Sequence, residues 1–359
     1  MSISGALPAA MQVSFKGYAG TLGAHFVCVC VCVCFCVCVR ARVYMCVYTH
    51  THTHTHTHTH TCIGADFVQH LISDSVSSPP EYAAAGYTEK LVYMPHTYYP
   101  VGNLATWKRE GRGEGRGGAG RSSQTRGLGP VREHYALPPS GIIYGAFNDH
   151  YKIDPNIFKI WMGILKDDVS VPANGSSSGG EGVGLSVLWA LKHGAEDMLP
   201  RTAKKHKVKG ERLIFSSFFP KAQHLHIKAL SDLFLDTPLY NAHSTASDML
   251  WAQVPVLTLP KEKMAARAAA SIVLAGGMGI GVARNEEDYR QLAPRLARFT
   301  GRLRQPGGAL SLEELARSNL FDELVFARAM LRCLRLLAEE HRLAVDASQG
   351  RHFHILVAA

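Results

Sequence analysis

From residue 135 onward, short apolar runs alternate with segments whose apolar residues repeat at helical spacing. The runs are 141–147, 185–191, 213–216, 232–235 and 256–259. After the first run, Asp154-Pro155 is a good N-cap and first helical position, and Ile157, Ile160 and Trp161 follow at helical spacing. Strands and helices that alternate at this pitch predict an α/β lobe, with a parallel sheet and helices on both faces. In the tail we expect an amphipathic helix over 312–343.

The segment 25–65 is unlike the rest of the chain. It holds eight of the nine cysteines, alternating with valine, and then six histidines alternating with threonine. Zinc sites use ligand pairs that a loop brings together, whereas strict alternation places the cysteines on one face of a strand. The apolar run 27–39 is shorter than the ~20 residues that span a bilayer, and it lies too far inside for a signal peptide. A DNA repeat of TG encodes Cys-Val and one of AC encodes Thr-His, so we interpret 25–65 as a translated repeat from a retained intron, without defined structure.

The distribution of charge and of cysteine indicates which partners and which compartment the protein has. The net charge of +9 comes from 102–133, which is Gly/Arg-rich and reads as a linker, and from 201–212. Basic residues confined to two stretches favour a solvated linker and an exposed helix end over a nucleic-acid-binding face. No apolar run is long enough to cross a membrane. Outside 25–65 there is one cysteine, Cys333, so we expect no disulfide framework and a reducing compartment.

The segment LFLDTPLYNAHSTASDMLW is the best candidate for chemistry. In an open parallel sheet, ligands bind at the carboxyl ends of strands, and anions bind at helix N-termini. Here a buried strand ends at Asp236, and His243, Ser244 and Thr245 open a helix whose N–H groups and dipole favour a phosphate. The pattern leaves open the alternative that Ser244 and Thr245 only cap the helix and that His243 is a loop residue.

Further candidates are expected at the same edge of the sheet. Asp248 lies one turn into the helix, where a carboxylate accepts hydrogen bonds from sugar hydroxyls. FNDHYKIDP follows the first strand and offers Lys152, and FPKAQHLHIKALSD follows the third and offers Lys221 and His224. The chain has no D-x-D pair, the usual arrangement for holding a metal against a nucleotide diphosphate. The residues therefore predict a metal-free nucleotide-sugar site.

Five segments resemble the catalytic region of protein O-linked N-acetylglucosamine (O-GlcNAc) transferases. They are MQVSFKGYAGTLGA, EKLVYMPHTYY, FNDHYKIDP, LDTPLYNAHSTASDMLW and VPVLTLPKEKMAARAAAS. The sequences of these segments are closer to the plant type of these transferases than to the related O-fucosyltransferases, which share the architecture. The resemblance implies a two-lobe GT-B fold. In it, 1–101 is a remnant of the N-terminal lobe, 134–311 is the Rossmann-like UDP-sugar-binding lobe, and 312–359 forms C-terminal helices.

The resemblance also implies a reaction. N-acetylglucosamine passes from UDP-N-acetylglucosamine (UDP-GlcNAc) to Ser or Thr hydroxyls of cytoplasmic and nuclear proteins, with inversion and without a metal or other cofactor. The partners are then the UDP-sugar and protein substrates, with neither nucleic acid nor membrane.

For the diphosphate half of the site, the resemblance implies roles for the residues at matching positions. Lys152 is expected to hold the diphosphate, and His243, Ser244 and Thr245 to cradle it at the helix start, which stabilises the leaving UDP. Asp149 stands where the family usually has Gln, and it places a negative charge near the diphosphate.

For the nucleoside half, the resemblance implies that Asp248 and Lys221 bind the ribose and that His224 packs against the uracil. No general base is identified. The family's first lobe begins well before MQVSF and contains histidines near the reacting centre. We therefore expect a truncated chain that itself transfers little sugar. The alternatives are an O-fucosyltransferase of the related type and a catalytically inactive UDP-binding scaffold.

Overall fold

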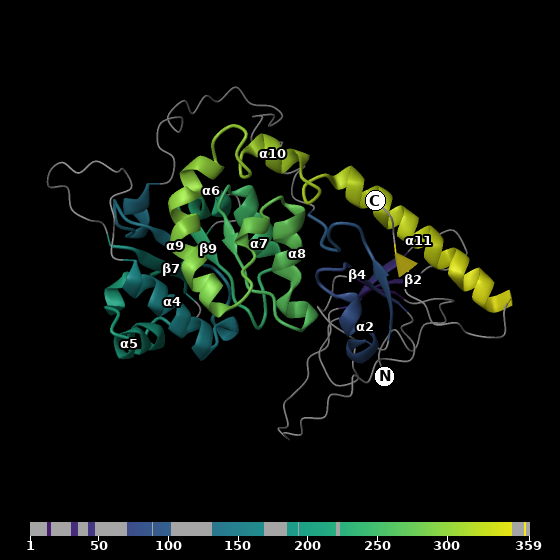
Figure 1. The fold of residues 1–359 in the computed structure, drawn as a ribbon, viewed down its shortest axis with the longest axis horizontal. Helices are drawn as coiled ribbons and strands as arrows, with labels where there is room; N and C mark the ends of the chain where they lie inside the picture. The colour runs from purple at the N-terminus through teal and green to yellow at the C-terminus, as the bar shows by residue number, and fades with distance from the viewer. Residues whose placement is uncertain are drawn as a thin grey trace, which may run out of the picture. The chain divides into compact units, whose positions relative to one another are not determined.

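The computed structural model describes residues 70–101 except 88, 131–168, 185–219 except 193, 223–346 and 355–356, together with strand backbone at 13–15, 30–34 and 42–46. The chain divides into two compact units (Figure 1). The first unit comprises Met1–Pro100, Glu262–Ser271 and Glu323–Ala359, and the second comprises Val101–Lys261 and Ile272–Asp322.

The first unit contains a mixed six-stranded sheet in the order β11-β5-β4-β1-β2-β3. Its strands are β1 (Val13–Phe15), β2 (Cys30–Cys34), β3 (Arg42–Cys46), β4 (His70–Ser73), β5 (Lys90–Tyr93) and β11 (Ile355–Leu356). β2 and β3 pair in antiparallel fashion inside the alternating tract. The expectation that 25–65 lacks defined structure is therefore wrong for these two segments, where valines in β2 and the Val43-Tyr44 pair in β3 favour a strand.

The segment 262–271 belongs to the first unit because its end is bonded to the turn after β4. The buried Asp74 carboxylate accepts hydrogen bonds from the Ser271 hydroxyl (2.7 Å) and from the Ser77 N–H (2.7 Å). Arg267 Nε donates to the Val76 carbonyl at 2.6 Å. The unit also contains the helices α2 (Pro80–Gly86) and α11 (Glu323–Asp346), and Lys90 Nζ lies 2.6 Å from Glu340 Oε1 of α11.

The second unit contains a five-stranded sheet in the order β10-β9-β6-β7-β8. All its pairings are parallel. The strands are β6 (Ile143–Ala146), β7 (Val187–Leu191), β8 (Leu213–Ser216), β9 (Leu233–Leu235) and β10 (Val256–Leu257). Each lies within one of the predicted apolar runs, so the predicted α/β lobe with a parallel sheet is confirmed.

The strand order creates a switch point between β6 and β9. From β6 the chain moves outward through α4 (Pro155–Asp167), β7, α5 (Met198–Lys205) and β8. It then returns through α6 (His224–Lys228) to β9 and continues outward on the other side, through α7 (Ser244–Trp251) to β10. Right-handed crossovers place α4 and α5 on one face and α6 and α7 on the other. Ligands of such sheets bind outside the carboxyl ends of the strands at this switch point.

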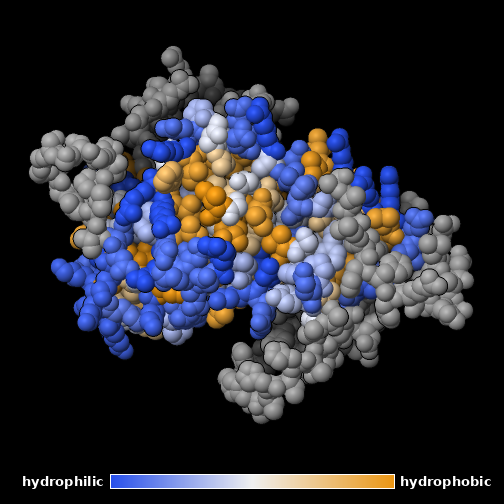
Figure 2. Space-filling view, in the orientation of Figure 1, coloured by the Kyte–Doolittle hydropathy of each residue, from blue (hydrophilic) through white to orange (hydrophobic). Residues whose placement is uncertain are grey.

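The helix α4 follows from its sequence signals. Asp154 is its N-cap, and the carboxylate accepts from the N–H groups of Asn156 (2.9 Å) and Ile157 (3.1 Å), as predicted. Ile157 and Trp161 are buried in a core cluster to which α5 and α9 (Glu286–Leu303) also contribute. Figure 2 shows hydrophilic side chains over α4 and α5, which therefore turn their polar sides outward.

The predicted single helix over 312–343 is wrong. The structure has α10 (Leu312–Arg317) and α11, and the backbone at Ser318 is extended, with φ −69° and ψ 150°. After this break, Leu320 is buried and its N–H donates to the Ala275 carbonyl at 3.1 Å. The Phe321 ring lies 4.9 Å from the Trp251 ring, centroid to centroid. Burial of these two side chains in the second unit interrupts the helical repeat.

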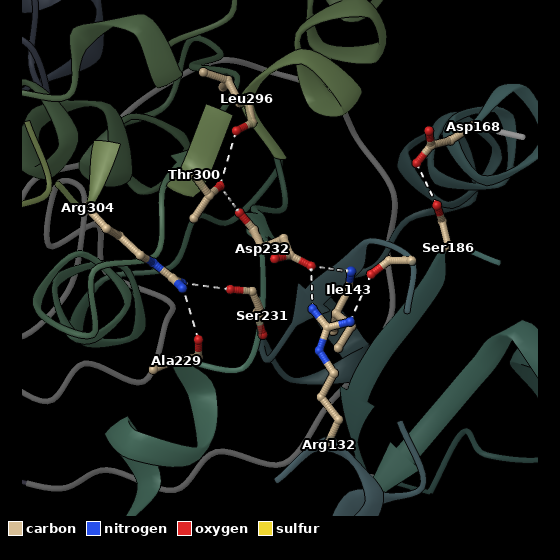
Figure 3. A network of polar contacts seen from close by, with 11 residues as sticks. Arg132, Ile143, Asp168, Ser186, Ala229, Ser231, Asp232, Leu296, Thr300 and Arg304 are labelled. Carbon is tan, nitrogen blue, oxygen red and sulfur yellow. Dashed lines mark hydrogen bonds and ion pairs between the residues drawn. The ribbon is translucent and has the colours of Figure 1, made fainter. Parts of the chain in front are cut away.

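Ion pairs and hydrogen bonds occupy the amino ends of the strands in the second unit (Figure 3). The Asp232 carboxylate, just before β9, accepts from the Ile143 N–H at the start of β6 (2.8 Å) and from Arg132 (3.2 Å). Before β7, the Ser186 hydroxyl donates to Asp168 at 2.6 Å. The amino edge of the sheet is therefore closed by internal contacts, and a ligand site belongs at the carboxyl edge.

Candidate functional site

The carboxyl ends of β6 and β9 are joined by buried hydrogen bonds. Asn148, after β6, donates from Nδ2 to Asp236 Oδ1 (3.1 Å) and to Thr237 Oγ1 (2.8 Å). The Asp236 carboxylate also accepts from the Ala242 N–H and from Thr258 Oγ1, each at 2.7 Å. These bonds fix the loop between β9 and α7, and thereby the start of α7.

A pocket of ≈ 380 Å³ lies at this edge of the sheet. Part of its wall is aromatic, and the Phe147 and Phe219 ring centroids are 6.1 Å apart. The polar side chains come from the ends of β6, α6 and α7, and they are Asn148, Asp149, Lys152, His224, Lys228 and Thr245. The pocket thus combines three basic side chains and one carboxylate with aromatic surface, a composition that suits an anionic ligand with a flat ring.

Lys152 is held by the loop that precedes α7. It ends the 3₁₀ helix η2 (His150–Lys152), and its Nζ donates to the Asn241 carbonyl at 3.3 Å and lies 4.5 Å from the Tyr240 ring centroid. Burial lowers the pKa of the Lys152 ammonium, and the carboxylates of Asp236 and Asp149 oppose this shift. Its ammonium therefore sits in a partly desolvated place, where it attracts an anion more strongly than it would in water.

His224 and Lys228 reach the same carboxylate from α6. His224 Nε2 lies 3.4 Å and Lys228 Nζ 3.9 Å from Asp248 Oδ2, on the first two turns of α7. Burial lowers the pKa of Lys228, and Asp248 opposes the shift. Asp248 thus positions two of the basic side chains of the pocket and is not itself part of its wall.

The start of α7 is not capped by a side chain. His243 is the N-cap residue and makes no side-chain cap hydrogen bond, and its ring lies 5.4 Å from the Tyr240 ring. Ser244 is exposed, and Thr245 lines the pocket. Thr245 therefore places the first turn of α7 at the wall of the pocket.

The structure brings together most of the residues predicted from sequence. Asp149, Lys152, His224 and Thr245 line one pocket, His243, Ser244 and Asp248 lie in the adjoining turns, and Lys221 falls outside the described residues.

Sequence reasoning missed Asn148 and Lys228. Asn148 adjoins Asp149 in FNDHYKIDP, but nothing in the sequence pairs it with Asp236. Lys228 is four residues after His224, and on a helix this spacing places both on one face. That spacing was a signal that could have found it.

Two negative findings apply to the described part of the chain. There, no three His, Cys, Asp or Glu side chains come together as a set of metal ligands. None of the helices described combines the length and apolar character that crossing a bilayer requires.

A solved structure has the same fold as this chain. A mutant O-GlcNAc transferase from Thermobaculum terrenum superimposes with a TM-score of 0.55 at 24% sequence identity, covering 77% of this chain and 46% of that chain. The match, the five-stranded parallel sheet and the pocket at its switch point together show a GT-B fold. The second unit is its Rossmann-like lobe.

Three sequence matches bear on the family. The model of glycosyl transferase family 41 matches residues 112–330. An Arabidopsis thaliana protein, "Probable UDP-N-acetylglucosamine--peptide N-acetylglucosaminyltransferase SEC", is 34% identical over 300 residues, 82% of this chain and 27% of the plant protein. A Caenorhabditis elegans UDP-N-acetylglucosamine–peptide N-acetylglucosaminyltransferase is 34% identical over 167 residues, 46% of this chain and 13% of the worm protein. The chain belongs to glycosyl transferase family 41, and it spans about a quarter of the length of the plant relative.

Proposed function

We propose that this protein is a UDP-GlcNAc–peptide N-acetylglucosaminyltransferase whose donor site is the pocket at the carboxyl edge of the second unit. Family membership and the names of the relatives support the reaction class. The observation that carries the proposal is that Lys152, His224 and Thr245, from three separate segments, line one pocket at the switch point. Nucleotides bind at this position in doubly wound sheets.

The diphosphate lies between Lys152 and the start of α7 in this proposal. The N–H groups at the helix start and the positive end of its dipole favour negative charge there, and His243, Ser244 and Thr245 supply the turn. As the bond to the sugar breaks, charge accumulates on the UDP oxygens, and a fixed cation stabilises it. Asp149 raises the pKa of Lys152 and so helps to keep it charged.

The nucleoside occupies the aromatic part of the pocket. The His224 ring packs against the uracil, and Asp248 and Lys221 contribute to ribose binding. The lysine and the helix end do the work that a divalent metal does in other nucleotide-sugar sites, so the proposed reaction uses no metal or other cofactor. Its acceptors are Ser and Thr hydroxyls of cytoplasmic and nuclear proteins, and inversion at the sugar is part of the proposal.

Transfer of labelled sugar tests this function directly. The purified chain is incubated with labelled UDP-GlcNAc and a Ser/Thr-containing peptide, beside the same peptide with alanine at those positions and a parallel reaction with GDP-fucose. We expect saturable UDP-GlcNAc binding, and we expect any label, however weak, to be confined to the hydroxyl-bearing peptide and to come only from UDP-GlcNAc. A chain that fails to bind UDP-GlcNAc, or that uses GDP-fucose instead, contradicts the proposal.

A further inference from the structure

Lys228 is a buried cation in the pocket wall. The residue is 7% exposed, its Nζ lies 3.9 Å from Asp248 Oδ2, and it lies 5.7 Å from the Phe147 ring centroid. An ammonium has three N–H donors, and 3.9 Å is longer than a hydrogen bond. Among the described residues, none accepts a hydrogen bond from this Nζ. Because burying a charge is costly unless it is paired and hydrogen-bonded, the group has bonding capacity that a ligand in the pocket can use.

Lys228 is on α6, and its contact with Asp248 of α7 indicates which part of a ligand it meets. Asp248 follows Thr245 by three residues, which corresponds to about 4.5 Å along a helix axis. The proposed diphosphate lies at the Thr245 end, beside Lys152. Lys228 therefore lies about one turn further along, on the nucleoside side.

The charge on Lys228 is also largely compensated. The Asp248 carboxylate is its neighbour, whereas the Lys152 ammonium donates to the neutral carbonyl of Asn241. A cation beside its own counter-ion gains little from a second anion, but its remaining N–H groups still donate to neutral oxygens.

We propose that Lys228 binds a neutral oxygen of the nucleoside half of the donor, either a ribose hydroxyl or a uracil carbonyl, and so determines nucleoside affinity without contributing to diphosphate affinity. This inference rests on the proposed function, because it needs a nucleotide in the pocket.

Calorimetry with two ligands separates this role from a structural one. UDP and inorganic pyrophosphate are titrated into the wild-type chain, Lys228→Met and, as a matched control on the exposed side of α4, Lys166→Met. We expect Lys228→Met to weaken UDP binding about tenfold, or about 1.4 kcal/mol, and to leave pyrophosphate binding within about twofold. Lys166→Met should change neither. Unchanged UDP binding by Lys228→Met, or an equal loss for both ligands, overturns the inference.

Analogues identify the oxygen. If Lys228 contacts the ribose, the wild type prefers UDP over 2′-deoxy-UDP or 3′-deoxy-UDP, and Lys228→Met loses that preference. If it contacts the uracil, the preference for UDP over CDP is lost instead. Should Lys228→Met unfold, Lys228→Gln retains a donor without the charge and is expected to keep part of the preference. If a folded Lys228→Met variant keeps both preferences, the inference is contradicted. A wild-type chain that binds no UDP contradicts the proposed function itself.

Discussion

At the scale of single residues, the Asp236 carboxylate connects three segments of the second unit. It accepts hydrogen bonds from Asn148 after β6, from Ala242 before α7 and from Thr258 after β10. The residue is fully buried, and burial raises the pKa of Asp236 to about 6, although the hydrogen bonds oppose the shift. One side chain therefore couples the geometry of the pocket to protonation.

The pKa of Asp236 predicts a specific pH dependence of stability. The unfolded value is about 4, so between about pH 4 and pH 6 the folded state binds more protons than the unfolded state. The contribution of Asp236 to the free energy of unfolding therefore falls as the pH rises, by about 3 kcal/mol across that window.

Urea unfolding at a series of pH values checks this prediction. Asp236→Asn does not titrate, so it should gain stability relative to wild type as the pH rises from about 4 to about 6. Asp197→Asn, at an exposed position, is the control and should run parallel to wild type. Parallel curves for wild type and Asp236→Asn would show that the carboxylate does not titrate in this range.

Pocket residues that closely follow the end of a strand could be predicted from the sequence. Residues whose role depends only on tertiary contacts could not. Lys152 and Thr245 could be predicted because each lies in a short connection from a recognisable strand to a helix. The bonds from Asn148 to Asp236 join residues 88 positions apart. No local pattern encodes such a pairing, because it depends on which strands become neighbours.

At the scale of elements, β10 and a later turn that packs against it support the loop before α7. Gly281 ends the 3₁₀ helix η5 (Gly279–Gly281), and its carbonyl accepts from the Thr258 N–H at 2.9 Å. A Cβ atom at Gly281 would lie 2.1 Å from the Val256 carbonyl oxygen of β10. No side chain fits there unless β10 moves.

Alanine substitutions at two glycines test this packing. Gly281→Ala should lower the free energy of unfolding by about 2 to 3 kcal/mol through overpacking, and it should weaken UDP binding because Thr258 supports Asp236. Gly301→Ala, in α9, meets no atom within 4 Å and should stabilise the protein by about 0.5 to 1 kcal/mol. Chemical unfolding measures both changes. A mild effect at Gly281 would mean that β10 is not held against this turn.

Helix boundaries were predictable where local chemistry sets them. Asp154 marks the start of α4 because its side chain caps the helix directly. The break between α10 and α11 was not predictable, since Leu320 and Phe321 fit a helical repeat and leave it only because they are buried in the second unit.

At the scale of the whole molecule, all the described residues that line the pocket belong to the second unit. The parallel sheet followed from the alternation of strands and helices. The strand order, which creates the switch point, did not, because it depends on the direction of each crossover. Which segments make up the first unit was also not predictable. Glu262–Ser271 belongs to it because Ser271 and Arg267 form hydrogen bonds with the turn after β4.

The central claim is that the pocket binds a uridine diphosphate through lysine and a helix N-terminus rather than through a metal. Calorimetric titration of UDP in excess EDTA, with wild type, Lys152→Ala and the control Lys166→Ala, tests it most directly. We predict binding by wild type and Lys166→Ala, and at least about tenfold weaker binding by Lys152→Ala, since charge-assisted hydrogen bonds contribute about 1.5 to 3 kcal/mol. Binding that requires a divalent metal, or equal affinity in all three proteins, would contradict the account.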